Sequence, residues 1–563
     1  VDYQGNIIKE LDEDAVRHVA EKLQDKGVES VAICYYFSFT NPRHEQRTKE
    51  IINEMLPNLC LSVSTEILPI IREYERLSTA TINAYIMPIM QSYLLRMRDK
   101  LKARGFTREY YLMQSSGGIM SSKVAGLRPV YTIDSGPAAG VTAAAQLGMT
   151  LGLQNVISFD MGGTTTKVCV VHGGRPEITT EFWVDGKYFI GAPVMNMVEI
   201  GAGGGSIVWI DAASAIHIGP QSAGAKPGPA CYKLGGTEPT ITDADLTLGY
   251  INADYFLGGE MAMDLDAAKA AIREKVAAKL GLSALEAAHG IYRLANAKMS
   301  GAIRVVTVQR GYDPRDFAMV VSGGSAPLHA VRLAQELHIS KVVVPLNPGV
   351  FSAFGLVTAD AKYDVFRSYV CRAPEANARR MQEIYTEMEE EGLGKIMELG
   401  FKREEIAIQY EVAMRYVGQA HEVIFEIPAM LIKEGFADNF IRKLEEKFHE
   451  QHQYLFGHSS PDAVTEFVTL SVSVIGPMTK SRMFEIEKGS IKPGQARKGT
   501  RKVYFEELNG YVDCPTFERS LLKANNTIIG PAIIEQMDST IVIPPEQKGI
   551  VDNFGNIVID ITA

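Results

Sequence analysis

The feature that most constrains the fold of this chain is a strand, a Gly-Gly turn and a second strand over residues 156–171. The apolar run 156–159 ends in Asp160, two glycines follow, and a threonine-rich segment leads back into apolar residues. Apolar runs of this length, separated by glycines, are typical of two strands joined by a tight turn. The sequence therefore predicts an apolar hairpin with a polar tip.

The tip of this hairpin carries residue types that bind phosphate. Gly162 and Gly163 lack a Cβ atom, so their backbone N–H groups can approach an anion closely. Hydroxyl groups of the threonines that follow can donate to phosphate oxygens, and the Asp160 carboxylate can hold a hydrated Mg²⁺ ion. An ordinary tight hairpin is the alternative, since glycine turns are common. The threonines concerned are Thr164, Thr165 and Thr166.

A second glycine turn lies much further along the chain. The apolar segment 319–321 runs into Gly323, Gly324 and Ser325, and a helical pattern follows. The N-terminus of such a helix suits a nucleoside or a phosphate, and an ordinary strand-to-helix connection is the alternative. The patterns GxxxxGK[ST], GxSxG and HExxH are absent from the sequence, which excludes a P-loop.

Two further segments are candidates for ligand contact. The glycine run 201–205, with Gly203 and Gly204 at its centre, can place successive N–H groups around an anion, or can allow another part of the backbone to approach. Asp243 and Asp245 would share a face if they lay on a strand and could then hold a cation. Alternatively, they cap the helix that follows them.

Composition excludes several classes of protein. The chain has 57 Lys+Arg against 67 Asp+Glu, a net charge of −10, and no dense basic run, so we expect no binding to nucleic acid. Its six cysteines are scattered without CxxC spacing, which argues against a zinc ribbon or a disulfide framework and favours a reducing, cytoplasmic location. Glycine and proline interrupt the most apolar stretches before these are long enough to span a bilayer, and no signal peptide is visible, so no membrane association is expected.

The length of 563 residues indicates three or four domains, and the patterns suggest how they follow one another. The segment 1–75 alternates helix and strand, with helices expected over about 11–27 and 41–55 and strands over 28–39 and 59–63. This order is typical of a parallel α/β sheet, and the segment looks like the second half of a domain. Strict alternation over 406–414 and 423–427 predicts strands, with helices over 375–399 and 439–455. The predicted segments are an α/β lobe (1–75), a connecting helix (76–105), a second α/β lobe (106–365), an α+β domain (366–499) and a small β-rich barrel or sandwich (500–563).

Taken together, the two glycine turns resemble the second phosphate loop and the adenosine loop of the actin, hexokinase and Hsp70 fold. The fold class expected is therefore α/β: a duplicated, two-lobed ATPase fold with a C-terminal β-rich region. In such ATPases the first lobe carries its own Asp-x-Gly-Gly-Thr hairpin, and here that hairpin would lie before residue 1.

Five glycine-rich blocks and one acidic block support a closer resemblance, to the hydantoinase A/5-oxoprolinase family. The resemblance runs from Glu13 to Ile533. Its blocks are 113–118 (MQSSGG), 135–140 (SGPAAG), the Asp160 hairpin, 201–206 (GAGGGS), 219–232 (GPQSAGAKPGPACY) and 240–246 (TITDADL).

The resemblance implies a cytoplasmic enzyme that uses ATP with Mg²⁺ or another divalent ion. Members work with a large subunit of the hydantoinase B type, and a small subunit supplying the missing first phosphate loop is a further expected partner. Some members open cyclic amides such as 5-oxoproline or hydantoins, and others are acetone or acetophenone carboxylases. Ring opening is the lead expectation, a ketone carboxylase subunit is the first alternative, and a non-catalytic scaffold subunit is the second. The resemblance identifies no catalytic residue.

Two positions depart from the family pattern. The hairpin of the family usually ends in Asp, whereas this chain has Lys167, a cation that could counter a phosphate or mark a lost metal ligand. Ser325-Ala326 replaces the usual Ala-Gly after the second glycine pair, a change that keeps the turn feasible. The expected metal ligands are Asp160 and Asp243. The expected ATP- and phosphate-binding residues are Asp160, Gly162, Gly163, Thr164, Thr165, Thr166, Lys167, Gly203, Gly204, Gly323, Gly324 and Ser325.

Overall fold

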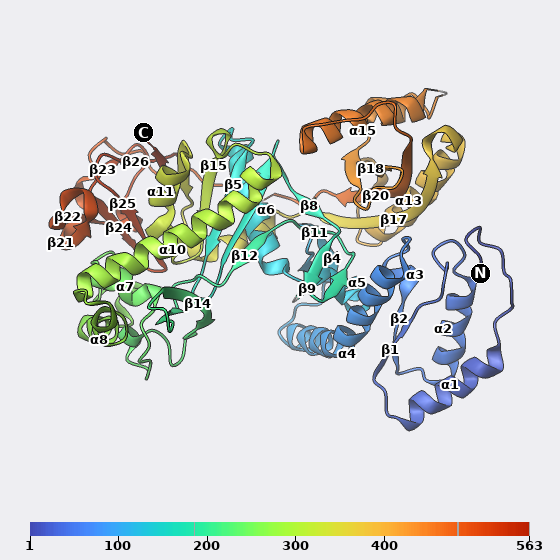
Figure 1. Ribbon diagram of the computed structural model, residues 1–563, viewed down its shortest axis with the longest axis horizontal. Coiled ribbons are helices and arrows are strands. Elements are labelled where there is room, and N and C mark those ends of the chain that lie inside the picture. Colours follow the sequence, from blue (N-terminus) through green and yellow to red (C-terminus); the bar gives the residue numbers. More distant parts are fainter. Residues whose placement is uncertain (185, 438, 481–482, 562–563) are drawn as a thin grey trace. The chain divides into compact units, whose positions relative to one another are not determined.

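The structure is a computed structural model that describes residues 1–184, 186–437, 439–480 and 483–561. The chain folds as two compact units, each built from three separate stretches. Unit 1 comprises residues 1–138, 178–194 and 359–479, and unit 2 comprises residues 139–177, 195–358 and 480–563. Figure 1 labels their helices and strands along the chain. The α+β segment expected over 366–499 is therefore divided between the units after Thr479.

Unit 1 begins with a small α/β layer. Strands β1 (Ser30–Ile33) and β2 (Cys60–Val63) pair in parallel and pack against helices α1 (Glu13–Asp25) and α2 (Arg43–Met55). Helix α1 forms because its apolar positions follow the helical period and because the Asp12 carboxylate accepts a hydrogen bond from the Ala15 N–H at 2.9 Å. The strand expected over 28–39 ends early, since the chain turns after Cys34 to bring its next residues onto Glu45.

A buried ion pair joins this layer to the long helix α4 (Glu73–Ala103). The Arg76 guanidinium on α4 lies 3.6 Å from the Glu45 carboxylate on α2, and both side chains are fully buried. Each is also hydrogen bonded to other groups, which compensates for the loss of hydration. The Glu45 carboxylate accepts five hydrogen bonds, from the N–H groups of Tyr35 and Thr65 and the hydroxyls of Ser38, Ser64 and Thr65.

The rest of unit 1 is organised around a six-stranded sheet, ordered β19-β18-β20-β17-β4-β3. Helix α13 packs on strands β17 and β20 of this sheet. The strands are β3 (Tyr111–Met113), β4 (Ile119–Ser121), β17 (Ala361–Arg372), β18 (Ala407–Tyr416), β19 (Val423–Glu426) and β20 (Thr465–Gly476), with a separate hairpin of β9 (Phe182–Val184) and β10 (Tyr188–Ile190). The remaining helices are α3 (Ser64–Ile67), α5 (Ser122–Leu127), α13 (Ala378–Met397), α14 (Ala429–Lys433) and α15 (Phe440–Phe456).

Unit 2 is built on a nine-stranded mixed sheet. Its path is β12-β6-β5-β15-β16-β27-β26-β23, and β7 pairs with β6. The strands are β5 (Val156–Met161), β6 (Thr166–His172), β7 (Arg175–Pro176), β12 (Val198–Ile200), β15 (Ala318–Ser322), β16 (Lys341–Val344), β23 (Thr527–Ile529), β26 (Lys548–Val551) and β27 (Ile557–Asp560). The helices are α6 (Ser135–Thr150, mostly in this unit), α7 (Ile241–Thr247), α8 (Leu265–Ile272), α9 (Ala278–Leu280), α10 (Ala284–Val306), α11 (Ala326–Leu337) and α12 (Phe351–Thr358), and β13 (Ser206–Ile210) pairs with β14 (Ile216–Ser222).

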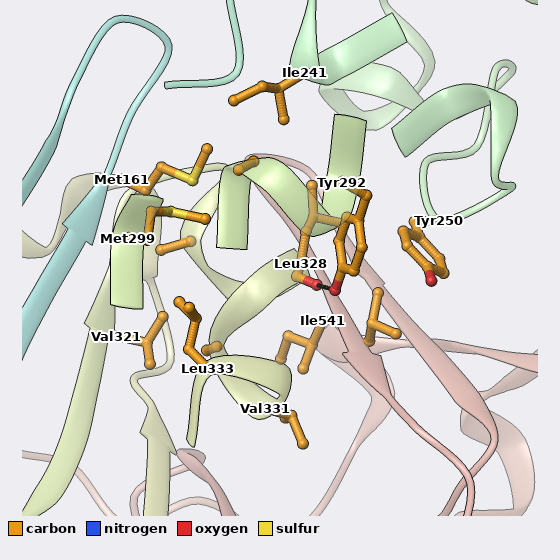
Figure 2. Close-up of a cluster of buried hydrophobic side chains, with 14 of the residues drawn as sticks. Met161, Ile241, Tyr250, Tyr292, Met299, Val321, Leu328, Val331, Leu333 and Ile541 are labelled. Atoms are coloured by element: carbon orange, nitrogen blue, oxygen red, sulfur yellow. Dashed lines mark hydrogen bonds between the residues drawn. The ribbon is translucent and has the colours of Figure 1, made fainter. Parts of the chain in front are cut away.

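The core of unit 2 fixes the position of helix α11. Figure 2 shows Leu328, Val331 and Leu333 of α11 among side chains from the sheet and from the neighbouring helices. The Tyr292 hydroxyl on α10 donates a hydrogen bond of 3.0 Å to the Leu328 carbonyl, which ties the first turn of α11 to this core.

The β-rich C-terminal segment expected over 500–563 is not a separate barrel or sandwich. Its strands β21 (Arg497–Phe505), β22 (Gly510–Glu518), β24 (Ala532–Gln536) and β25 (Ser539–Ile543) form a four-stranded sheet. Strands β23, β26 and β27 instead extend the nine-stranded sheet, where β27 pairs antiparallel with β16. Among the described residues, no helix has the length and apolar character needed to cross a membrane.

We predict that the Glu45–Arg76 pair stabilises the N-terminal layer strongly. Glu45→Ala should lower its free energy of unfolding by about 3–5 kcal/mol, because it removes the only fully buried carboxylate paired with the buried Arg76 among the described residues and leaves it the partly exposed Glu73 at 3.6 Å. Urea unfolding monitored by hydrogen exchange of residues 13–63 measures this change. Glu50→Ala is the matched control, since the Glu50 side chain is 61% exposed and pairs only at the surface with Arg47. Equal effects of the two variants would contradict the prediction.

Candidate functional site

The two glycine turns predicted from the sequence meet at one edge of the nine-stranded sheet. Strands β5 and β6 form the expected hairpin, with Asp160 opposite Lys167. Strand β15 runs parallel to β5 and places Ser322 opposite Asp160. Because both strands end at the same edge, the Gly323–Gly324 turn lies directly beside the polar tip of the hairpin.

The Asp160 carboxylate is largely buried and is not neutralised by a close partner. Among the described residues it accepts no hydrogen bond and makes no ion pair. Burial raises its pKa, and the more distant charge of Lys167 partly opposes that shift. Lys167 itself is engaged elsewhere, since its Nζ atom donates to the Thr165 hydroxyl at 2.7 Å and lies 3.0 Å from the Glu199 carboxylate. Both Asp160 oxygens are therefore available to a cation.

The glycines of the hairpin and of the 201–205 run serve different purposes. A Cβ atom added at Gly162 or Gly163 would meet open space. The Gly162 N–H donates to the Thr165 carbonyl at 3.2 Å, so it is the Gly163 N–H that has no partner among the described residues. A Cβ at Gly203 would lie 2.6 Å from the Thr164 backbone, which makes this glycine necessary for close packing. The Gly204 N–H donates to the Gly162 carbonyl at 3.0 Å. The 201–205 run therefore supports the tip of the hairpin, the alternative that sequence reasoning left open for it.

The three threonines of the hairpin also differ in what their hydroxyl groups contact. The Thr166 side chain is fully buried and its hydroxyl donates to the Ala202 carbonyl at 2.5 Å, so that group is committed to the fold. The Thr165 hydroxyl accepts the hydrogen bond from Lys167. Thr164 lines a cavity of unit 2 together with Gly162 and Gly163. Of the hydroxyls in this segment, that of Thr164 is thus the best placed to contact a ligand.

The turn after β15 is constrained by its neighbours on both sides. Gly323 has φ of +85°, and a Cβ there would lie 2.5 Å from the Asp160 carboxylate. A Cβ at Gly324 would lie 2.9 Å from the Asp538 carbonyl. Ser325 precedes α11 and makes no side-chain hydrogen bond to the helix, so its hydroxyl is open to a ligand. Of the N–H groups here, those of Ser325 and Leu328 donate to the carbonyls of Met161 and Ser325 and Pro327 has none, which leaves the Ala326 N–H as the donor without a partner among the described residues.

These segments line a cavity of about 340 Å³, a size that suits a small molecule. It is lined by both glycine turns, by the aromatic stretch around Tyr255 and by a turn near the C-terminus. The lining residues are Gly162, Gly163, Thr164, Gly204, Gly205, Gly224, Ala225, Pro229, Tyr232, Thr242, Ile251, Asn252, Tyr255, Phe256, Leu257, Gly324, Ser325, Leu328, Gln536, Met537, Asp538, Ser539 and Thr540.

Sequence reasoning missed the turn between β24 and β25, which forms one wall of this cavity. The Asp538 Oδ2 atom accepts a hydrogen bond from the Gly349 N–H at 3.1 Å, whereas its Oδ1 atom is buried without a partner. Glu535 anchors the same wall, since Asn252 donates to its carboxylate at 3.0 Å and Lys498 lies 2.8 Å from it. A lone Asp in a β-turn, far from Asp160 in the sequence, gives no local signal of this role.

Asp243 lies on helix α7 and not on a strand, and its carboxylate caps this helix, which is one of the two possibilities that the sequence left open. Its Oδ1 atom accepts from the Cys231 N–H, and its Oδ2 atom accepts from the N–H groups of Ala230 and Thr240 and from the Thr240 hydroxyl. Thr240 completes a capping box. With both oxygens engaged in a fully buried site, Asp243 has the capping role weighed as the alternative, and its geometry does not support metal binding.

Asp245 lies on the same helix and faces a histidine. Its Oδ2 atom is 3.6 Å from the Nε2 atom of His329, and both side chains are buried. Burial raises the pKa of Asp245, and His329 opposes that shift. Within the described part of the chain, no three His, Cys, Asp or Glu side chains gather closely enough to form a metal centre by themselves. A divalent ion at Asp160 would therefore depend on other ligands, such as phosphate oxygens and water.

The hairpin, the neighbouring glycine turn and the cavity beside them define a protein of the actin, hexokinase and Hsp70 fold class, as the sequence indicated. Family models agree with this architecture over almost the whole chain. The hydantoinase/oxoprolinase model matches residues 76–365, the C-terminal domain model of the same family matches 372–558, and its N-terminal region model matches 1–56. The chain belongs to the hydantoinase/oxoprolinase family.

Three relatives match the chain over nearly its full length. An uncharacterized protein of Methanocaldococcus jannaschii is 41% identical over 99% of this chain and 80% of its own length. The caprolactamase subunit alpha of Pseudomonas jessenii is 35% identical, over 96% of this chain and 77% of its own. The acetophenone carboxylase gamma subunit of Aromatoleum aromaticum is 33% identical, over 100% and 78%.

The solved structures that share the fold include a caprolactamase and an acetone carboxylase. The ATP-dependent caprolactamase from Pseudomonas jessenii superimposes with a TM-score of 0.90 at 33% identity, over 100% of this chain and 81% of that one. The nucleotide-free acetone carboxylase gives a TM-score of 0.78 at 27% identity, over 100% and 80%. The expected fold class is therefore confirmed.

We predict that Asp160 lowers the stability of unit 2 at neutral pH. A carboxyl group whose pKa is raised in the folded state costs stability once the pH exceeds its unfolded value of about 3.9. Asp160→Asn should therefore raise the melting temperature at pH 7, and the gain should shrink as the pH falls toward 4. Thermal unfolding across this pH range measures it. The control Asp513→Asn removes a carboxylate that is 69% exposed and should give no such gain.

Proposed function

We propose that this chain is the ATP-binding subunit of an ATP-dependent enzyme that phosphorylates and opens a cyclic amide. The observation that carries the proposal is the meeting of an unpartnered Asp160 carboxylate, two open glycines and the N-terminus of α11 beside one cavity. Phosphoryl transfer depends mainly on positioning and on charge neutralisation of the phosphates, which these groups are suited to provide.

Different residues at this end of the sheet would bind different parts of the nucleotide. The Gly163 N–H and the Thr164 hydroxyl would bind phosphate oxygens, and the Ser325 hydroxyl and the Ala326 N–H at the start of α11 would add further donors. The unpartnered Asp538 Oδ1 atom fits a hydroxyl or amino group of the nucleoside. When bound, ATP supplies the phosphoryl group that activates the amide oxygen of the substrate.

Asp160 is the residue best suited to hold Mg²⁺ or another divalent ion. Its carboxylate lies at the end of β5, is largely buried and is not paired with a cation within the described residues. Lys167 would supply a counter-charge to the phosphates while keeping its contacts with Thr165 and Glu199. Asp243 is left out of this metal site because both of its oxygens accept hydrogen bonds.

The proposed substrate class is supported by the names of the relatives that match this chain. The caprolactamase subunit alpha is named for a cyclic amide, and its solved structure superimposes closely on this chain. An ATP-dependent ketone carboxylase subunit is the alternative, favoured by the likeness to the acetophenone carboxylase gamma subunit. These relatives are named as subunits, which supports a hetero-oligomer with a large subunit of the hydantoinase B type. A non-catalytic scaffold remains the alternative of another class.

The role of Asp160 gives a direct test of ATP use. In the assembled enzyme, Asp160→Asn should reduce ATP-dependent turnover at least 100-fold, roughly the loss seen when one preorganised charged group is removed from a site. The same variant should remain folded, since it removes a buried charge. Phosphate release under saturating Mg-ATP measures turnover. Turnover close to wild type in a well-folded Asp160→Asn variant would favour the scaffold alternative.

A cyclic amide hydrolase and a ketone carboxylase differ in the molecule that reacts with the activated carbon of the substrate. Opening of a cyclic amide ends with water as the acceptor, whereas carboxylation requires bicarbonate. We expect the assembled enzyme to release phosphate when given a lactam such as 5-oxoproline or a hydantoin, with a ring-opened acid as product and no dependence on bicarbonate. Mass spectrometry of the product identifies the acid. Turnover that responds only to ketones and requires bicarbonate would establish the carboxylase alternative instead.

A further inference from the structure

Unit 1 contains a site that the proposed function does not use. Arg128 follows helix α5 and lies between two cavities, of about 530 and 750 Å³. It lines both of them, together with Glu66, Ile67 and Glu391. All lining residues of the two cavities belong to unit 1, and none is shared with the cavity of unit 2.

Two aromatic rings hold the Arg128 guanidinium in place. Its central carbon lies 5.1 Å from the ring centroid of Tyr363 on β17 and 6.0 Å from that of Tyr131. Tyr131 is buried, and its hydroxyl donates to the Ile67 carbonyl at 2.9 Å, so this ring has little freedom to move. Stacking on aromatic faces suits a guanidinium and leaves its edge, which carries the N–H donors, directed away from the rings.

The backbone around Arg128 is equally constrained. The buried side chain of Asn83 donates to the Leu127 carbonyl at 3.1 Å and accepts from the Val130 N–H at 3.2 Å. The Arg128 N–H donates to the Val124 carbonyl at 2.8 Å. The residue is thus fixed from both sides, and a ligand would pay little conformational entropy to use it.

The donors of Arg128 have no partner among the described residues. None of the hydrogen bonds or ion pairs in the described part of the chain involves its guanidinium. The other cations that line the two cavities do have partners. Lys49 lies 2.7 Å from Glu66, Arg367 lies 2.6 Å from Glu391, Arg380 lies 3.0 Å from Glu383, and Lys395 lies 3.3 Å from Glu398. Within the described residues, Arg128 is therefore the unpaired cation of these walls.

We propose that Arg128 binds the carboxylate of a small organic acid in the cavities on either side of it. The planar guanidinium matches a carboxylate through two parallel hydrogen bonds. Because the other four cations of these walls already pair with carboxylates, Arg128 offers a single uncompensated positive charge, which a singly charged carboxylate matches better than a doubly charged phosphate. The inference rests on the unpaired donors of Arg128 and is independent of the proposed ATP site.

Isothermal titration calorimetry of the full chain tests the site. The probes are 5-oxoproline, acetate, 2-pyrrolidinone and inorganic phosphate, added without nucleotide. The first and third share a lactam ring, but only the first carries a carboxylate. We expect saturable binding of 5-oxoproline and acetate that depends on Arg128, whereas any binding of 2-pyrrolidinone, which has no carboxylate, should be the same in the unaltered chain and in Arg128→Gln. Arg128→Gln should weaken carboxylate binding about tenfold or more, the usual loss when a charge-assisted hydrogen-bonding partner is removed.

Arg380→Gln is the matched control. Arg380 lines one of the same cavities, but its guanidinium already pairs with Glu383, so its loss should change carboxylate affinity less than twofold, roughly the effect of a screened surface charge. Binding that is equally weakened by both variants, or unaffected by Arg128→Gln, would overturn the proposal. An equal loss of 2-pyrrolidinone and 5-oxoproline binding in Arg128→Gln would also overturn it, as would tighter binding of phosphate than of either acid.

A measurement on the unaltered chain covers the case in which Arg128→Gln fails to fold. Phenylglyoxal modifies arginines whose guanidinium groups are unpaired, and mass spectrometry reports the rate at each site. We expect Arg128 to react and acetate or 5-oxoproline to slow its modification, whereas 2-pyrrolidinone should leave the rate unchanged. An Arg128 that reacts at the same rate with and without the acids would contradict the proposal.

Discussion

The parallel pairing of β15 with β5 is the interaction on which the proposed site depends. It places Ser322 opposite Asp160, and so brings together two turns that are far apart in the sequence. The strands on either side continue the same sheet through β6 and β16. The core beneath them, shown in Figure 2, holds helix α11 so that its first turn opens beside the hairpin. The same end of the sheet therefore supplies both the Asp160 carboxylate and the backbone N–H donors of the proposed site.

Close packing at this edge explains much of the glycine content of the central blocks. Gly203 and Gly323 are required because backbone or carboxylate atoms occupy the space where a side chain would lie. Gly162 and Gly163 face open space, where the Gly162 N–H closes the turn on the Thr165 carbonyl and the Gly163 N–H is open to a ligand. The same motif therefore combines glycines that allow the fold with glycines that suit a ligand. Sequence alone does not separate the two, because the difference depends on which segment packs against each glycine.

Much of the secondary structure could be predicted from the sequence because it follows from local patterns. Helices α1, α4 and α13 and strands β2, β18 and β19 lie close to the expected bounds, since hydrophobic period and capping residues act within a few positions. The strand expected over 28–39 was too long, because contacts with Glu45 turn the chain early. The C-terminal strands were placed in one module, but long-range pairing with β16 divides them between two sheets.

The sequence by itself determined the hairpin, the second glycine turn and the family, because these depend on residues adjacent in the chain. Only the tertiary structure decided what each polar side chain does. Asp243 lies close to Asp245 in the sequence, yet one caps a helix and the other faces a buried histidine. The cavity wall at Asp538 and the stacked Arg128 are assembled from segments that are distant in the chain. A side chain acquires its partners and its degree of burial only when distant segments pack together, so no local pattern specifies them.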